Sequence, residues 1–289
     1  MTAAKEGDPV LLSFAFCNDC AICKAGHYSN CNNFNELNFG GPFKNFALAS
    51  KGGEPEIGGA FFGQSSFASL SIVRECSVVN AKSLVKSKED LQLFAPLGCG
   101  IQTGSGTVVN AAKAEQKDVI VILGLGGVGL SAVMGAKVQG CRSIIGVDRV
   151  ASRLQMAKEL GCTEVIDGSK IGDKMKLEDA IKEAAEGVGA TIVVDTTGAP
   201  PLVNAGIASL RNKGRYYQVG TTPFDFKLEQ NMFEFMVAGK SVNGAIEGEA
   251  YPPEYVPKMI GWYRDGKFPF DRLCKFMKAD EFEQALKEM

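Results

Sequence analysis

Four cysteines near the start of the sequence have a spacing that suits a metal ion. Cys17, Cys20, Cys23 and Cys31 form the pattern C-x2-C-x2-C-x7-C. Four thiolates at such spacing can complete a tetrahedron around Zn²⁺ and leave no open coordination position, which is typical of a structural rather than a catalytic zinc site. The alternative is a group of free thiols. We expect zinc at these four residues.

A glycine-rich stretch in the middle of the chain has the spacing of a dinucleotide-binding turn. Residues 124–129 read GLGGVG, which fits the pattern G-x-G-x-x-G. In that pattern Gly124 permits a tight turn, Gly126 lets the backbone approach a pyrophosphate, and Gly129 lets a helix pack closely on a strand. The phosphates then lie on unpaired N–H groups at the helix N-terminus.

The elements around these glycines complete a β-α-β unit. Residues 119–123 and 143–147 are apolar runs typical of buried strands, and residues 130–139 have helical spacing. Asp148 stands at the tip of the second strand, about 20 residues after Gly129, the separation of a ribose-binding acid. Its charge would repel a 2′-phosphate, which favours NAD over NADP. The alternative is a glycine-rich turn in an unrelated α/β protein.

Strand and helix patterns alternate from residue 101 to residue 246. The pattern predicts strands over 119–123, 143–147, 164–167, 191–195 and 214–220, with helices over 130–139, 151–160, 177–186 and 201–210. Such alternation predicts a doubly wound α/β domain with a parallel sheet. Before it, residues 9–16 and 78–85 read as strands, residues 32–59 as an irregular lobe, and residues 60–73 as a strand pair or bent strand.

Composition and charge argue against some classes of protein and indicate a cellular compartment. The 289 residues carry a formal net charge of −2, so there is no electrostatic case for binding nucleic acid or a membrane surface. No apolar run of about 18 residues is present, and the first residues lack the features of a signal peptide. We expect a cytoplasmic protein, in which the cysteines are not a disulfide framework.

The order of these motifs resembles a known family. The cysteine cluster is followed by GCGIQTG at 98–104, then by GLGGVG, by VD at 147–148 and by VGTTP at 219–223. Over essentially the whole chain this order resembles the zinc-containing alcohol dehydrogenases of the medium-chain dehydrogenase/reductase superfamily. FFGQSSFA and PLGCGIQTGSG are most similar to its aryl-alcohol (benzyl alcohol) dehydrogenase branch. The resemblance implies a partial GroES-like catalytic domain with the zinc lobe (1–100), a Rossmann NAD-binding domain (101–246) and a segment returning to the catalytic domain (247–289).

The resemblance also implies roles for single residues. It assigns the structural zinc to Cys17, Cys20, Cys23 and Cys31, the pyrophosphate turn to Gly124, Gly126, Gly127 and Gly129, and the ribose to Asp148. It makes Cys99 the third protein ligand of the catalytic zinc, places Thr103 near the nicotinamide and Arg153 beside the adenosine, and gives Val219 a backbone contact to the carboxamide. The alternatives are a buried structural cysteine for Cys99 and a solvated surface charge for Arg153.

The sequence departs from the family pattern at the catalytic site. The segment with the first cysteine ligand and its neighbouring hydroxyl residue, and the GHE segment with the histidine ligand, are not found, and the sequence stops before the family's last strand. We therefore expect a chain truncated at both ends. Cys99 alone cannot complete a catalytic zinc site, which needs three protein ligands and an open position.

Three functions are weighed against one another. The first is an NAD-dependent zinc alcohol dehydrogenase that interconverts a primary, aromatic or allylic alcohol and its aldehyde, and that forms a homo-oligomer through the sheet edge near residues 239–248. The second is a non-catalytic, NAD-binding remnant of such an enzyme. The third is a zinc-free reductase of the quinone reductase type, which the four cysteines and the GCG segment disfavour. The sequence does not identify the particular alcohol.

Overall fold

The computed structural model describes residues 3–40, 44–46, 57–58, 61–64, 69–172 and 175–288. Its helices are α1 (Ala21–Lys24), α2 (Phe34–Asn38), α3 (Lys88–Phe94), α4 (Gly100–Gly106), α5 (Gly127–Gln139), α6 (Ala151–Leu160), α7 (Leu177–Ala184), α8 (Pro200–Ala208), α9 (Met232–Ala238), α10 (Pro252–Arg264) and α11 (Phe282–Glu288). Its strands are β1 (Val10–Leu12), β2 (Lys44–Phe46), β3 (Ile57–Gly58), β4 (Val78–Asn80), β5 (Val119–Leu123), β6 (Ser143–Asp148), β7 (Glu164–Asp167), β8 (Ala190–Asp195), β9 (Leu210–Gln218) and β10 (Ser241–Gly244). No described helix is long and apolar enough to span a membrane.

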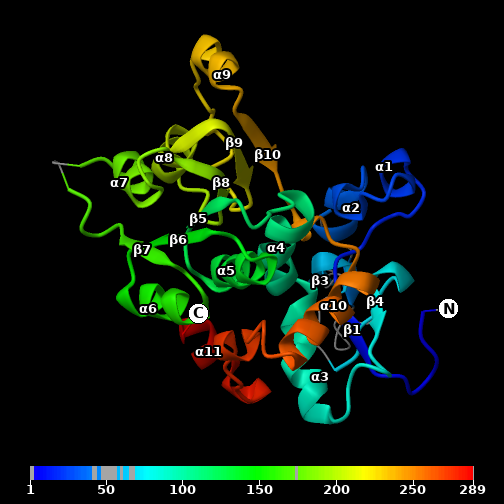
Figure 1. Cartoon of the computed structure of the whole chain (residues 1–289). Coiled ribbons are helices and arrows are strands. Elements are labelled where there is room, and N and C mark those ends of the chain that lie inside the picture. Colours follow the sequence, from blue (N-terminus) through cyan, green and yellow to red (C-terminus); the bar gives the residue numbers. More distant parts are fainter. Residues whose placement is uncertain are drawn as a thin grey trace.

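A six-stranded parallel sheet forms the centre of the fold (Figure 1). Its strand order is β10-β9-β8-β5-β6-β7, and every neighbouring pair is parallel. The chain runs outward from β5 to β6 and β7, then returns to the other side of β5 with β8. This reversal is the topological switch point of a doubly wound sheet, where ligands bind beyond the carboxyl ends of the strands.

Both faces of the sheet are covered, because side chains alternate along each buried strand. Ile120 and Ile122 point to one face, where they join the core formed with α5 and α6. Val119, Val121 and Leu123 point to the other face and pack with α7 and α8. All five are fully or almost fully buried, which explains why β5 is a continuous apolar run rather than an alternating one.

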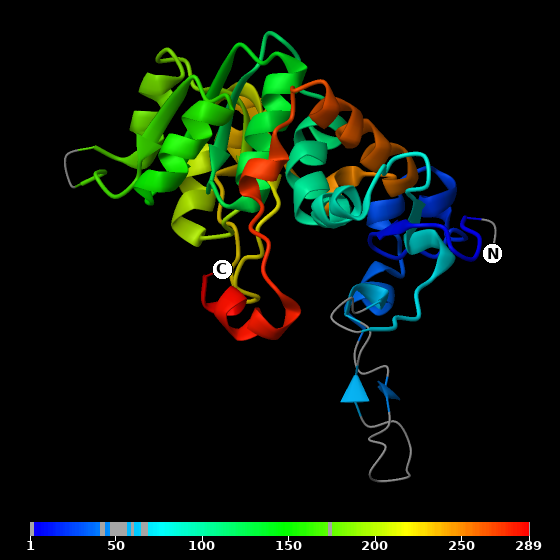
Figure 2. The ribbon, with the colours of Figure 1, turned by 90° about the horizontal axis from the view of Figure 1, so that it is seen from below.

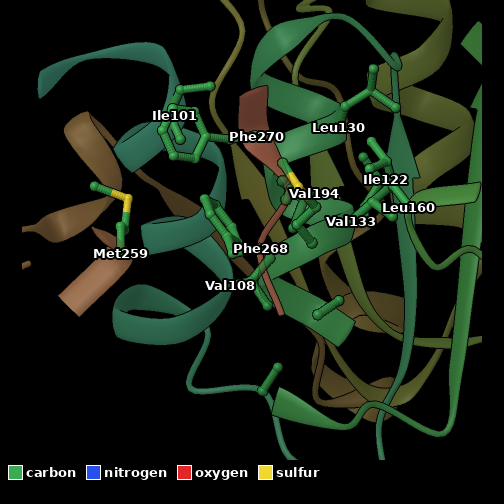
Figure 3. Close-up of a cluster of buried hydrophobic side chains, with 14 of the residues drawn as sticks. Ile101, Val108, Ile122, Leu130, Val133, Leu160, Val194, Met259, Phe268 and Phe270 are labelled. Carbon is green, nitrogen blue, oxygen red and sulfur yellow. The ribbon is translucent and has the colours of Figure 1, made fainter. Parts of the chain in front are cut away.

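Helices α4 and α10 extend the first core away from the sheet (Figure 3). Glycines let α4 approach α5 closely: a Cβ added at Gly104 would lie 1.9 Å from the carbonyl oxygen of Val128. The apolar side chains at this junction come from four segments and include Ile101, Val108, Leu130, Val133, Met259, Phe268 and Phe270. The tight contact fixes the start of α4 beside the start of α5.

The N-terminal residues form a smaller lobe at the opposite end of the molecule from α7 (Figures 1 and 2). Strand β1 pairs antiparallel with β4. The lobe has its own aromatic core around Phe14, Phe16 and Phe34. The ring of Tyr28 stacks on that of Tyr251 with 4.5 Å between centroids, so the lobe also packs against the segment that follows β10.

The predicted α/β class, with a Rossmann domain and a four-cysteine lobe, is confirmed. Two local predictions are wrong. Residues 32–59 were expected to form an irregular lobe, but they include helix α2 and the antiparallel strands β2 and β3. Residues 60–73 were expected to form a strand pair or bent strand, but 61–63 form a short turn and 69–74 have no regular structure. The remaining residues of that stretch, 60 and 65–68, lie outside the described residues. The apolar alternation there does not lead to strand pairing, because Leu70 and Ile72 are exposed rather than buried on one face.

Candidate functional site

The carboxyl ends of the central strands meet around one cavity of about 610 Å³. The turn that follows β5 forms one wall with Gly124, Gly126 and Gly127. The other walls come from the ends of β6 and β8 and from the helices behind them; they include Asp148, Arg149, Val150, Arg153, Thr196, Thr197, Leu177 and Leu202. The cavity therefore lies at the switch point, where the topology predicts a ligand site.

The four glycines of the turn are required for different structural reasons. Gly124 takes φ +85°, a left-handed conformation that favours glycine. A Cβ at Gly129 would lie 1.8 Å from the carbonyl oxygen of Gly124, so this position needs glycine for packing. A Cβ at Gly126 or Gly127 would meet nothing within 4 Å. These two positions face open space at the start of α5, where the first N–H groups have no partner within the helix, and this cradle fits a dinucleotide pyrophosphate.

Asp148 is held rigidly at the end of β6. Its Oδ2 accepts a hydrogen bond from the N–H of Leu125 at 2.7 Å, and its Oδ1 accepts from the N–H groups of Arg149 and Val150 at 2.7 and 2.9 Å. Arg153 on α6 lies close by, with 3.8 Å between its Nη1 and Oδ2. A carboxylate can accept about four hydrogen bonds, so these bonds orient Asp148 and leave capacity for a ribose hydroxyl.

The loop after β8 was not singled out by the sequence reasoning, yet it lines the cavity. Buried Asp195 accepts hydrogen bonds from the N–H and the hydroxyl of Thr197 at 2.7 and 2.6 Å, and from the hydroxyl of Tyr216 at 2.8 Å. Thr196 in turn donates to the carbonyl oxygen of Gly124 at 3.0 Å. The available signal in the sequence was an acid at the end of the buried run TIVVD (191–195), which matches Asp148 at the end of β6.

Val219 follows β9 and lies at the same edge of the sheet. Its N–H donates to the carbonyl oxygen of Asp195 at 2.9 Å, which ties the end of β9 to the end of β8. One strand further, the N–H of Ala245 donates to the carbonyl oxygen of Gln218 at 2.9 Å. Val219 is half-buried, and the turn at Glu247–Glu249 that follows β10 contacts α4.

Cys99 stands at the start of α4, next to the glycine turn. A Cβ added at the following residue, Gly100, would lie 3.7 Å from the Val128 side chain, which also lines the cavity. Thr103 is one helical turn further, and its hydroxyl donates to the carbonyl oxygen of Cys99 at 2.9 Å. Cys99 is exposed, so the alternative of a buried structural cysteine is wrong.

The sequence reasoning missed Glu247, which reaches Cys99 from the turn after β10. Its Oε1 lies 3.8 Å from the Cys99 sulfur, and its Oε2 accepts from the amide of Gln102 at 2.9 Å. Burial raises the pKa of Glu247 to about 7, against the opposing effect of these hydrogen bonds. Although Cys99 as a residue is exposed, the protein atoms around its thiol shield it from water, and together with the nearby carboxylate they raise its pKa to about 12. No motif marks Glu247, because it lies 148 residues from Cys99 in the sequence.

The four N-terminal cysteines converge as their spacing predicts. Their sulfur atoms all lie within 4.8 Å of one another, and those of Cys17 and Cys23 are 3.9 Å apart. Thiolates around a tetrahedral Zn²⁺ stand about 3.8 Å apart. The N–H groups of Cys23 and Asn32 hydrogen-bond the sulfur of Cys20 and lower its pKa to about 6, whereas burial raises the pKa of Cys23 to about 12. This donor set fits a structural zinc ion.

A three-ligand catalytic zinc does not fit the described residues around Cys99. Only Glu247 contributes a second ligand atom there, since the cysteine lobe is the only group of three or more potential ligand side chains in the described part of the chain. We therefore assign no catalytic step to a zinc ion at Cys99.

The geometry defines a doubly wound α/β fold with a four-cysteine lobe that fits a zinc ion, and known proteins share this fold. A model of the zinc-binding dehydrogenase family matches residues 127–265. The geraniol dehydrogenase of Castellaniella defragrans is 38% identical over 284 residues, covering 98% of this chain and 74% of that relative. An alcohol dehydrogenase zinc-binding domain protein from Burkholderia ambifaria has a TM-score of 0.88 at 36% identity, covering 99% of this chain and 75% of that one. The benzyl alcohol dehydrogenase of Acinetobacter calcoaceticus has a TM-score of 0.87 at 37% identity, with the same coverage.

The chain belongs to the zinc-containing alcohol dehydrogenase family of the medium-chain dehydrogenase/reductase superfamily. The resemblance drawn from the motifs is thereby confirmed. Members of this family are oxidoreductases that use zinc and NAD(P), and the relatives above are named for small-molecule alcohols.

Proposed function

We propose that this chain binds NAD in the cavity beyond β5 and β6 and takes part in the interconversion of a primary alcohol and its aldehyde. The observation that carries the proposal is Asp148, which three backbone N–H groups hold at the cavity wall with acceptor capacity to spare. The glycine cradle at Gly126 and Gly127 supports a pyrophosphate beside it. Bound NAD would supply the hydride acceptor for alcohol oxidation.

The preference for NAD over NADP follows from charge. A 2′-phosphate on the adenosine ribose would stand against the Asp148 carboxylate, which the protein keeps in a fixed position. Arg153 faces this carboxylate at 3.8 Å and neutralises it only in part. We assign the adenosine side of the cofactor to these two residues, and the nicotinamide side to Thr103 and to the backbone of Val219.

The relatives favour an allylic or aromatic alcohol as the substrate. The C. defragrans relative is named for geraniol and the A. calcoaceticus structure for benzyl alcohol. Both alcohols are primary and carry the hydroxyl next to an unsaturated carbon. The exposed thiol of Cys99 and the hydroxyl of Thr103 lie in the first turn of α4, where we expect such a substrate to meet the nicotinamide.

A second candidate function is NAD binding without dehydrogenation. It is favoured by the ligand set at Cys99, where the described residues bring together one sulfur and one carboxylate rather than three ligands. The two candidates share the cofactor site and differ only in the chemistry beside it.

Two measurements on the purified chain separate these candidates. NADH fluorescence titration should show saturable binding, with NADPH bound more weakly. NADH formation from benzyl alcohol or geraniol should then appear for the first candidate and be absent for the second. A chain that binds neither dinucleotide would contradict both candidates.

We also propose a homo-oligomer that forms through β10, the edge strand of the sheet. The strand leaves one side of its backbone without a neighbouring strand among the described residues. Helix α9, which precedes it, projects away from the sheet (Figure 1) and carries exposed Met232, Phe233, Met236 and Val237. An apolar edge of this kind is typical of a surface that a second copy covers.

A further inference from the structure

Asp195 is a fully buried acid at the end of β8, and its side chain organises the loop that follows the strand. Its Oδ1 accepts hydrogen bonds from the N–H and the hydroxyl of Thr197 at 2.7 and 2.6 Å, and from the N–H of Gly198 at 3.2 Å. Its Oδ2 accepts from the hydroxyl of Tyr216 at 2.8 Å. Thr197 lines the cavity and Asp195 lies behind it. Asp195 therefore shapes this wall of the cavity from within the protein.

The backbone of Asp195 holds a second segment, the one that follows β9. Its carbonyl oxygen accepts from the N–H groups of Val219 and Gly220, each at 2.9 Å. The two loops also fit closely together. A Cβ added at Gly198 would lie 2.2 Å from the carbonyl oxygen of Thr221, and one added at Gly220 would lie 2.5 Å from the nitrogen of Gly198. A single residue thus fixes the loop after β8 against the segment after β9.

Tyr216 reaches Asp195 from the core that α7 and α8 form with the sheet. The tyrosine is fully buried, and its hydroxyl also lies 2.7 Å from Gln218 Oε1. The amide nitrogen of Gln218 in turn donates to the carbonyl oxygen of Gly220. A buried carboxylate without hydrogen-bond partners is costly. The loop conformation and the hydrogen bonds to Asp195 therefore stabilise one another.

The end of β8 lies between the two halves of the proposed cofactor site. The neighbouring strands run in the order β6-β5-β8-β9. Asp148 at the end of β6 is assigned to the adenosine, and Val219 after β9 to the nicotinamide. A cofactor that reaches from one to the other has to pass the end of β8. The hydroxyl of Thr196 connects this loop to the glycine turn as well, since it donates to the carbonyl oxygen of Gly124 at 3.0 Å.

We propose that Asp195 is a positioning residue for the nicotinamide half of the dinucleotide, which comprises the nicotinamide and its ribose. Through its hydrogen bonds it holds residues 196–198 and the segment at Val219 in the arrangement that this half of the cofactor contacts. The inference rests on the proposed NAD binding and adds a residue that acts through its neighbours. Ordering a loop on binding costs affinity, so a loop that Asp195 holds beforehand binds the cofactor more tightly.

Comparing two ligands of the purified chain tests this role. ADP carries the adenosine and the pyrophosphate, whereas NADH adds the nicotinamide half, and isothermal titration calorimetry gives the affinity for each. Asp195→Ala should lower the NADH affinity by about 10-fold or more and keep the ADP affinity within about twofold, because only the loop beside the nicotinamide half loses its support. Asp195→Asn should keep the NADH affinity within about threefold, because its amide oxygen can still accept from the loop and its nitrogen can donate to the Tyr216 hydroxyl.

The two adjacent tyrosines of β9 provide a matched pair of variants. Tyr216→Phe removes the hydroxyl that donates to Asp195 and should lower the NADH affinity about threefold, with the ADP affinity unchanged. Tyr217→Phe is the control, because its hydroxyl donates to the carbonyl oxygen of Ala111 at 3.3 Å and its side chain packs in the other core. It should bind both ligands as the wild type does. Thermal melting shows whether each variant folds, and Tyr216→Phe decides the question should Asp195→Ala not fold.

Several outcomes would overturn the proposal. Equal losses of ADP and NADH affinity in the Asp195→Ala or Tyr216→Phe variant would indicate a general structural role, and unchanged affinities for both ligands would indicate no role. An Asp195→Asn variant that binds NADH as weakly as Asp195→Ala would show that the charge matters rather than the hydrogen bonds. A wild-type chain that binds neither ligand would contradict the proposed function itself, and this proposal with it. A wild-type chain that binds both, with variants that do not distinguish them, would overturn only the role of Asp195.

Discussion

At the scale of single residues, the position of Asp148 is set by its local backbone. The three N–H groups that bind it come from Leu125 in the glycine turn and from the two residues that follow Asp148 itself. The sequence predicted an acid at this place from spacing alone. The structure adds that the carboxylate is oriented before any cofactor arrives, so little of its motion has to be lost on binding.

This orientation leads to a prediction about cofactor preference. Asp148→Ala should reduce the ratio of NAD to NADP affinity by at least about 10-fold, or about 1.4 kcal/mol, because the charge that opposes the 2′-phosphate is gone. Separate titrations with NADH and NADPH measure the ratio. Asp167→Ala, at the end of the neighbouring strand β7, is a control that removes an equal charge. An unchanged ratio of NAD to NADP affinity in Asp148→Ala would contradict the role assigned to this residue.

At the scale of elements, two glycines at the junction of β5 and α5 are expected to have separate roles, Gly129 in packing and Gly126 in cofactor binding. Gly129→Ala should lower the melting temperature by about 5 °C or more, because its Cβ would overlap the carbonyl oxygen of Gly124. Gly126→Ala should melt near the wild-type temperature, since its Cβ meets no protein atom, yet it should bind NADH more weakly because that space is needed by the pyrophosphate. Differential scanning fluorimetry and NADH titration measure the two effects. Similar melting of both variants would contradict this division.

The cysteine lobe is the second element whose stability can be tested. Cys20→Ser should not bind the proposed structural zinc and should melt at a lower temperature, because all four side chains would be needed to hold the ion and the lobe has a small core of its own. Metal analysis and thermal melting give the two readouts. A strong chelator should lower the melting temperature of the wild type toward that of the variant and leave the variant unchanged. Cys76→Ser, outside the cluster, should keep its zinc.

At the scale of the whole molecule, the proposed homo-oligomer depends on the sheet edge at β10. Val242→Lys places a charge on the exposed edge strand and should shift the chain toward monomer. Val188→Lys is the matched control, because Val188 is also exposed but lies between α7 and β8. Sedimentation velocity gives the molar mass of each. An oligomer that survives Val242→Lys unchanged would argue against pairing through this edge.

The sequence alone correctly predicted the features that depend on residues close together in the chain. The period of apolar residues predicted α6 over 151–160, and the structure has it at those bounds. Glycine and cysteine spacing predicted the turn at 124–129 and the convergence of four sulfurs, because the chemistry in each case lies within a few residues. Local alternation misled at 60–73, where Leu70 and Ile72 have no partner strand to pack against among the described residues.

Tertiary structure decided what stands beside Cys99. Glu247 comes from the turn after β10 and reaches Cys99 only because the strand order brings that turn to α4 and because Gly248 can lie against the helix backbone. No spacing rule connects residues 148 positions apart in the sequence. The cofactor turn could be predicted because its geometry is local. The contact between Cys99 and Glu247 next to it could not, because it depends on the packing of distant segments.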